Sequence, residues 1–214
     1  MLATLALLAG LSLAAPPGAE AAPGDAGLQP LPALRSQARP YLRWQRRLER
    51  VAHPEPAYHF VADVHADIAP LVEAMPERVA PFRVGTSVEG RPIWGFRIRE
   101  HSAPVERRLL VFANIHALEW ITTEIAVAFL RDLARRPPRG VEVVVIPVLN
   151  PDGRAKVERD LLAGDNKYRR GNAPNVDLNR DFAVNREARA VWRKLIPRRY
   201  VTSDAPLSQP ESQA

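Results

Sequence analysis

Two apolar runs separated by one helical segment constrain the fold of this chain most strongly. Residues 109–113 form an uninterrupted apolar run, and residues 121–135 place apolar side chains at helical spacing. The segment 137–140, Pro-Pro-Arg-Gly, ends this helix, and a second apolar run follows over residues 141–148. A strand that is apolar on both faces is typical of a parallel sheet, so the order strand, helix, strand predicts a βαβ unit.

The segments before this unit predict one more helix and two more strands. A helix over residues 62–75 gathers its apolar side chains on one face, although Pro70 would weaken it by removing a backbone hydrogen bond. Residues 82–85 and 93–98 predict strands joined through a turn that contains Gly and Pro. Together these elements predict an α/β fold with a mixed, mainly parallel sheet flanked by helices.

Residues 1–21 predict a signal peptide that is not part of the fold. Residues 2–15 are an apolar run too short to span a bilayer, and residues 19–21 offer an A-x-A cleavage site. Because no Lys or Arg precedes the run, a membrane anchor and a misassigned start codon are the alternatives. Cleavage after Ala21 would make the protein secreted or periplasmic. Residues 22–56, rich in Pro, Ala, Gly and Arg, predict an N-terminal extension or linker.

The remaining residues, 57–214, are predicted to form one domain that ends abruptly. Residues 208–211 carry a helix-start pattern, with Ser as the cap, Pro near the first turn and Glu three residues after the Ser. Only Ser212, Gln213 and Ala214 follow, and a helix of one turn cannot bury an apolar face. We therefore expect the domain to be incomplete.

The charge of the chain is basic, with 30 Lys+Arg against 24 Asp+Glu. Clustered arginine is typical of nucleic-acid binding, but here the arginine pairs are dispersed among acidic residues and no recognition motif accompanies them. Nucleic acid is therefore not an expected partner. The chain contains no cysteine, which removes any disulfide framework, and after residue 21 no segment is long and apolar enough to cross a membrane.

His116 and Glu119 follow the first apolar run directly and stand three residues apart. Side chains at this spacing lie on one side of a helical turn and can converge on one zinc ion, and α/β folds place ligand sites where strands end. The alternative, a solvated histidine beside a glutamate that favours a helix N-terminus, stays open for this motif alone. The other histidines lack a suitable partner at short spacing and are interpreted as structural or exposed: His53, His59, His65 and His101.

Polar, loop-rich sequence follows the second apolar run. Residues 150–153, Asn-Pro-Asp-Gly, predict a turn. Arg169 could polarise a carbonyl group and stabilise an oxyanion, and Asn179 with Arg180 could bind a carboxylate through a forked set of hydrogen bonds. Taken alone, these arginines are more simply explained as surface residues.

In this order, the motifs resemble those of the zinc carboxypeptidase family of metallopeptidases. The matching blocks are residues 85–92, 116–120, 150–153, 168–170, 176–182 and 208–211. The resemblance implies a zinc carboxypeptidase-like fold, in which residues 57–214 are a catalytic domain that lacks its C-terminal half. It also assigns roles to six residues: His116 and Glu119 as ligands of one Zn²⁺, Asp177 as the carboxylate that orients the histidine, Arg169 at the oxyanion, and Asn179 and Arg180 on the substrate carboxylate.

The resemblance also implies residues that this chain lacks. In the family, a second zinc-binding His, a substrate-capping Tyr and a general-base Glu come later, and no histidine follows His116 here. We therefore predict no appreciable peptidase activity for the 214-residue chain. Leu118 stands where the family often has Arg, which puts one substrate contact in question, and Tyr168 stands where Trp is common.

The activity that this resemblance implies is hydrolysis of the C-terminal peptide bond of peptides and proteins. Three alternatives stay open from the sequence. A related amidase or endopeptidase that cuts cell-wall muropeptides would share the zinc residues. A non-catalytic module would bind C-terminal carboxylates without turnover. An unstable fragment would expose an unpaired sheet edge and aggregate.

Overall fold

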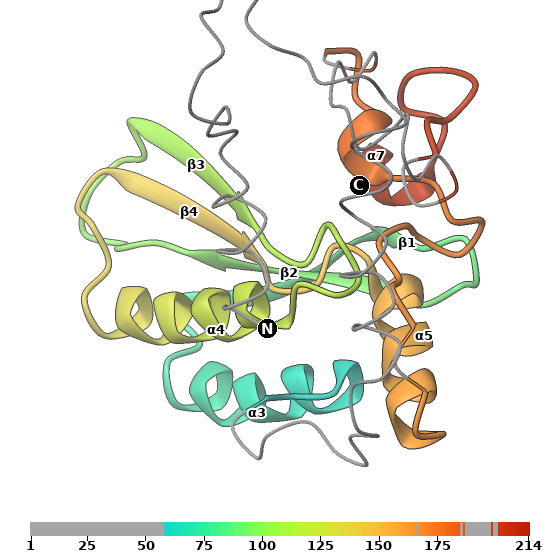
Figure 1. Cartoon of the computed structure of the whole chain (residues 1–214). Coiled ribbons are helices and arrows are strands. Elements are labelled where there is room, and N and C mark those ends of the chain that lie inside the picture. The colour runs from blue at the N-terminus through green and yellow to red at the C-terminus, as the bar shows by residue number, and fades with distance from the viewer. Residues whose placement is uncertain (1–57, 166, 185, 187–197, 199–200) are drawn as a thin grey trace, which may run out of the picture.

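The computed structural model describes residues 58–165, 167–184, 186, 198 and 201–214. The predicted signal peptide (1–21) and extension (22–56) lie outside the described residues. In the described part, no helix combines the length and the apolar character needed to cross a bilayer. The elements are α3 (Val61–Ala74), β1 (Val79–Thr86), β2 (Pro92–Ile98), β3 (Arg107–Phe112), α4 (Trp120–Arg135), β4 (Val141–Ile146), α5 (Pro151–Leu162), the 3₁₀ helix η1 (Leu178–Arg180) and α7 (Pro210–Gln213) (Figure 1).

The four strands form one sheet in the order β1-β2-β4-β3. Strands β3 and β4 pair in parallel and are connected by α4, which confirms the predicted βαβ unit. Strand β2 pairs antiparallel with both β1 and β4. The fold is mixed α/β as predicted, but antiparallel pairings outnumber the parallel one in the described part, because β1 and β2 form a hairpin on the far side of β4.

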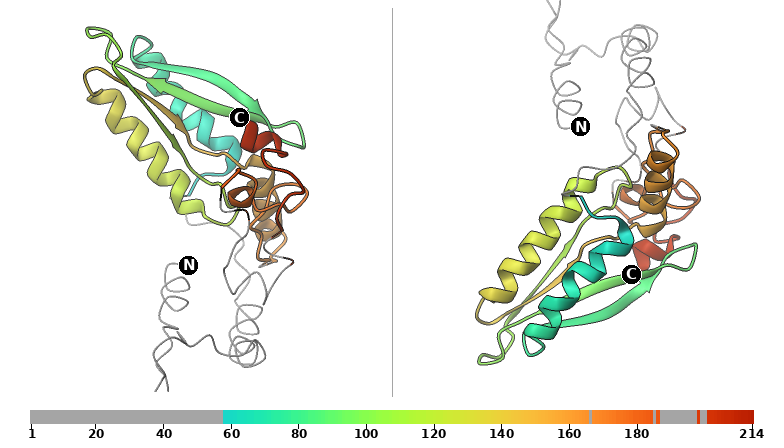
Figure 2. Two further views of the ribbon diagram at one scale, coloured as in Figure 1. Left: turned by 90° about the horizontal axis from the view of Figure 1, so that it is seen from above. Right: turned by 90° about the horizontal axis from the view of Figure 1, so that it is seen from below.

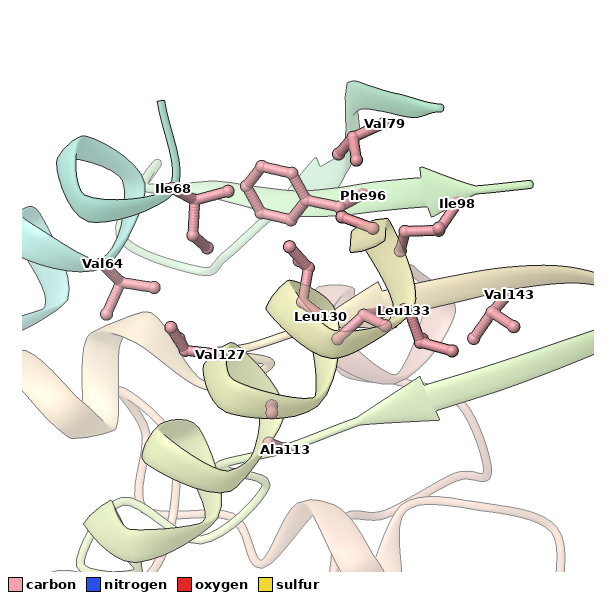
Figure 3. Close-up of a cluster of buried hydrophobic side chains, with 13 residues drawn as sticks. Val64, Ile68, Val79, Phe96, Ile98, Ala113, Val127, Leu130, Leu133 and Val143 are labelled. Carbon is pink, nitrogen blue, oxygen red and sulfur yellow. The ribbon is translucent and has the colours of Figure 1, made fainter. Parts of the chain in front are cut away.

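Helices α3 and α4 cover one face of the sheet (Figures 1 and 2). Between them and the strands lies the main apolar core, in which Ile68 of α3, Phe96 of β2 and Leu130 of α4 are buried (Figure 3). Helix α3 forms as predicted although Pro70 lies inside it, and Pro70 itself is exposed. The burial of Val64 and Ile68 offsets the lost hydrogen bond.

Two local predictions differ from the structure. Residues 150–153, predicted as a turn, begin α5, because the Asn150 side chain accepts a hydrogen bond from the Gly153 amide (2.9 Å) and Pro151 suits a first helical turn. Helix α7 is present where the helix-start pattern predicted it, but its N-cap is Gln209 and no side chain caps it. The expected cap, Ser208, instead donates its hydroxyl to Asp181 (2.9 Å).

Strand β3 is one of the two edge strands of the described sheet and is exposed along most of its length. Leu110 is 57% exposed and Phe112 is 42% exposed. The loops that follow β3 and β4 lead to one end of the sheet, where α5, η1 and α7 also lie (Figure 1). That end carries every residue to which the sequence assigned a role.

Candidate metal and carboxylate site

The loop between β3 and α4 carries His116 and Glu119, and Asn114 sets its shape. Asn114 is buried and has φ of 54°, a left-handed conformation that asparagine tolerates better than most residues. Its side-chain amide donates to the carbonyl of His116 (3.1 Å), and its backbone amide donates to the Thr122 hydroxyl (2.9 Å). Asn114 carries no predicted role, although an Asn after a strand is a sequence signal for such a turn.

The structure brings His116 and Glu119 together. The Nδ1 atom of His116 lies 2.8 Å from Oε1 of Glu119, and its Nε2 atom lies 3.2 Å from Oδ1 of Asp177. Burial of the ring lowers the pKa of His116, but hydrogen bonds to Asp177 and Glu119 outweigh it, so the net effect is a raised pKa. One imidazole is thus held between two carboxylates.

Asp177 connects this histidine to the segment that carries the predicted carboxylate-binding residues. It is fully buried; Oδ1 also accepts from the backbone amide of Asn179 (3.1 Å), and Oδ2 accepts from Nε of Arg170 (2.8 Å). Burial would raise the pKa of the carboxyl, but the hydrogen bonds from His116 and Arg170 hold it at about 2. Asp177 is therefore ionised across the physiological range.

The two neighbouring arginines lie in different surroundings. Arg169 donates to both carboxylate oxygens of Asp160 (2.6 and 3.3 Å), and its side chain is 39% exposed. Arg170 is 13% exposed, and its Nη1 atom lies 3.8 Å from Oε1 of Glu119. The structure therefore places Arg170, for which the sequence predicted no role, beside the histidine and glutamate. Sequence alone could not rank two adjacent arginines.

Asn179 and Arg180 lie in η1 directly after Asp177. The Asn179 side chain is exposed, and Arg180 is partly buried. Arg180 donates from Nη1 to the carbonyl of Asn179 (2.7 Å), and its buried Nε has no hydrogen-bond partner among the described residues. A partly buried guanidinium next to an exposed amide is suited to binding an anion.

Comparison with known proteins identifies the family. A family model described as zinc carboxypeptidase matches residues 64–214. The chain is a member of the zinc carboxypeptidase family. Members of this family are metallocarboxypeptidases that act on the C-termini of peptides.

The relatives of this zinc carboxypeptidase chain are longer. A zinc carboxypeptidase of Simulium vittatum is 31% identical over 128 residues, which cover 56% of this chain and 40% of that protein. The structure of thrombin activatable fibrinolysis inhibitor has a TM-score of 0.61 at 20% identity, and carboxypeptidase A of Helicoverpa armigera has 0.57 at 23%; each match covers 82% of this chain and 48% of the other. The chain thus spans about half the length of these relatives, and the two structural likenesses concern the fold.

The donor atoms of this family member fit two ligand positions of a zinc site. Carboxylates face both ring nitrogens of His116, so a zinc ion between Nδ1 and Glu119 would replace the proton on Nδ1 and leave the Nε2 proton to Asp177. A catalytic zinc takes three protein ligands as a rule. In the part of the chain that the structure describes, no group of three His, Cys, Asp or Glu residues could hold a metal.

Two further blocks of the family pattern have structural roles in this chain. Asp152, in the first turn of α5, is fully buried and binds the β1–β2 turn from three directions. It accepts from the Ser87 hydroxyl (2.7 Å), the Glu89 amide (2.8 Å) and Nη1 of Arg91 (2.7 Å). The two blocks, residues 85–92 and 150–153, therefore form one contact. This contact fixes the end of the sheet at which His116 and Asp177 lie.

The C-terminal block is held in the same way by buried acids. Asp181, directly after η1, accepts from the hydroxyl groups of Ser203 and Ser208 and from the Gln209 amide (2.9 Å). Burial would raise the pKa of Asp181, but these hydrogen bonds lower it. Glu211 is 1% exposed and accepts from the Asn172 side chain (3.1 Å), and burial raises its pKa. These contacts anchor the segment around η1.

Proposed function

We propose that this chain supplies the first part of the active site of a zinc-dependent metallocarboxypeptidase that hydrolyses the C-terminal peptide bond of peptides or proteins. The observation that carries the proposal is the position of Asp177. One buried carboxylate orients the candidate zinc ligand His116 and also binds the backbone of η1, which carries Asn179 and Arg180. A metal ion on His116 and a substrate carboxylate on Asn179 and Arg180 would therefore be held relative to each other by a single side chain.

His116, through Nδ1, and Glu119 are the residues that would hold zinc. A bound zinc ion supplies a Lewis acid for the scissile carbonyl and lowers the pKa of a water molecule. With zinc on Nδ1, Asp177 would accept the remaining proton of His116 at Nε2 and so increase the basicity of the ligand. The third ligand and the general-base Glu that the family resemblance implies would come from outside the described residues.

The substrate's terminal carboxylate would be held by Asn179, which offers an exposed side-chain amide, and by the partly buried guanidinium of Arg180. The family resemblance of the sequence implies Arg169 as the residue that stabilises the oxyanion. Its guanidinium is bound to Asp160, whereas Arg170 lies beside Glu119, so the geometry favours Arg170 for this role. Replacing each arginine separately with alanine in a turnover assay of the complete enzyme would decide between them.

Binding experiments on the 214-residue chain test the two sites separately. We expect Zn²⁺ to bind at a stoichiometry of one, measured by calorimetry, and binding to be abolished in His116→Ala and Glu119→Ala. We expect a dipeptide with a free terminal carboxylate to bind more tightly than its C-terminal amide, and Arg180→Ala to remove this preference. Arg139→Ala, which changes the same charge in the exposed turn before β4, is the matched control.

Turnover separates the alternatives. The chain by itself is expected to release no C-terminal residues, and zinc-dependent release by it would contradict that expectation. A complete protein that digests muropeptides but not free peptide C-termini would identify a cell-wall amidase. Carboxylate binding that is lost in Arg180→Ala, without zinc binding, would identify a non-catalytic module. Cleavage of residues 1–21 during export, read by N-terminal sequencing, would support a secreted or periplasmic enzyme.

A further inference from the structure

Helix α5 contains an arginine whose burial the proposed chemistry does not explain. Arg154 is fully buried, with a relative exposure of 0%. Its Nη2 atom donates to the carbonyl of His59 (2.6 Å), its Nε atom donates to Glu158 (3.2 Å), and its guanidinium lies 3.5 Å from the ring centroid of Trp120. Burial lowers the pKa of Arg154 to about 10, so it stays cationic at neutral pH.

The aromatic partner of Arg154 is the residue directly after Glu119. Trp120 is 6% exposed and begins α4. Together with Ala117 and Val157 it forms a small apolar cluster, and Tyr58 and Phe60 pack against this cluster. Edge-to-face contacts join Trp120 to both aromatic rings, at 6.5 and 6.1 Å between centroids.

The His116–Glu119 turn is therefore divided between two environments. Ala117 and the adjoining Trp120 are buried in the apolar cluster, whereas His116 and Glu119 contact each other and His116 contacts Asp177. Because Ala117 and Trp120 are both fixed in a packed cluster, the turn between them has little freedom to rotate. The packing beneath Trp120 consequently sets the direction in which the two candidate ligands point.

We propose that Arg154 is a positioning residue for the candidate metal site: it clamps Trp120 and so holds Glu119 beside His116. This proposal rests on the proposed zinc-binding function. A buried cation is costly unless it is paired, so an apolar residue would be expected at this position if packing were its only role. Arg154 instead joins three segments, because Glu158 also accepts from the backbone amide of Val61 at the start of α3 (2.7 Å).

The test uses the full chain and three variants. Arg154→Met keeps the length and the apolar contact with Trp120 but removes the charge and the donors, and Arg154→Lys restores the charge without the planar stacking. Val127→Ala removes a buried side chain from the main core between α3, α4 and the sheet (Figure 3), and this core does not include Trp120. It serves as the control for a general loss of stability.

Two readouts are measured on each variant. The first is Zn²⁺ affinity, by competition with a chromophoric chelator, for which we expect a loss of about tenfold or more in Arg154→Met, partial recovery in Arg154→Lys and less than about twofold loss in Val127→Ala. The second needs no metal. It is hydrogen exchange of the Glu119 amide, which donates to the carbonyl of His116 (3.0 Å), and we expect Arg154→Met to reduce its protection selectively.

The outcomes separate this proposal from the one on which it rests. If the unaltered chain binds no Zn²⁺, the proposed function fails, and the exchange of the Glu119 amide alone decides whether Arg154 positions the turn. If Arg154→Met and Val127→Ala lower zinc affinity and amide protection in the same proportion, Arg154 is only a structural residue. If neither readout changes in Arg154→Met, the positioning role is overturned.

Discussion

Two histidines of this chain have the same kind of neighbours but lie in different parts of the fold. His59 precedes α3, and its Nδ1 atom lies 2.7 Å from Oε2 of Glu124 while its Nε2 atom lies 3.3 Å from Oδ2 of Asp67. His116, in the β3–α4 loop, is likewise held between two carboxylates. Hydrogen-bond geometry alone therefore does not distinguish a candidate metal ligand from a structural link.

The two histidines differ in burial and in the elements that carry their partner carboxylates. The side chain of His59 is 24% exposed, and its partner Asp67 is 28% exposed and also bound by Arg131. The side chain of His116 is 8% exposed, and its partner Asp177 is 0% exposed. The partners of His59 belong to two helices, which that histidine joins. The partners of His116 lie in loops at the end of the sheet, and the side chain of one of them, Glu119, is 33% exposed.

Removing the buried partner should have the largest effect on stability. Asp177→Asn keeps the shape of the side chain but leaves His116 and Arg170 without their negative charge. Breaking a buried charge network by removing one partner costs about 3 kcal/mol. We expect that loss in the free energy of unfolding, measured in urea without added metal. Asp67→Asn is the matched variant at the His59 cluster and should lose less than about 1 kcal/mol.

Equal losses in Asp177→Asn and Asp67→Asn would contradict the comparison. They would mean that burial of the carboxylate does not control the strength of these networks. The urea m-value should stay the same in both variants, because a change in m would indicate a different denatured state and not a local effect.

The contact between His116 and Glu119 could be predicted from the sequence, because side chains three residues apart lie on the same side of a helical turn. The contacts of His59 were not readable, since its partner Glu124 is 65 positions away and is met only when α3 packs against α4. The same limit applies to the choice between Arg169 and Arg170, which depends on the position of Asp160. The strands and helices around the site followed from apolar periodicity, whereas α5 was missed because its first turn is built from turn-forming residues.

Acid should weaken the His116 cluster through Asp177. The folded-state pKa of this carboxyl is about 2, below its ordinary value of 3.8, so its contribution is fully present above pH of about 4 and is lost as the pH falls toward 2. The difference corresponds to about 2 kcal/mol. Urea unfolding of the unaltered chain and of Asp177→Asn, measured from pH 5 down to pH 2, should give curves that converge at the acid end. Parallel curves would show that the contacts with His116 and Arg170 do not lower the pKa of Asp177 in the folded protein.

The adjacent residues Arg169 and Arg170 allow the same comparison, because Arg170 forms a buried ion pair and Arg169 forms a partly exposed one. Arg170→Ala should lower the free energy of unfolding by about 1.5 kcal/mol, because it removes the donor that Oδ2 of Asp177 has among the described residues. Arg169→Ala should lower it by less than about 0.5 kcal/mol, since its ion pair with Asp160 is partly exposed and screened. A larger loss in Arg169→Ala than in Arg170→Ala would reverse the assignment of the site arginine.

A small effect is also expected at His59, the histidine that resembles His116 in geometry but not in burial. Glu124→Gln keeps a hydrogen-bond acceptor for the backbone amide of His59 (2.9 Å) and removes only the charge. Because water can reach this cluster, the free energy of unfolding should fall by about 0.5 kcal/mol and the loss should shrink further in 1 M salt. Zinc affinity should not change. A loss of zinc affinity in Glu124→Gln would show that the two clusters are coupled through α4, at whose N-terminal end Glu119 and Glu124 both lie.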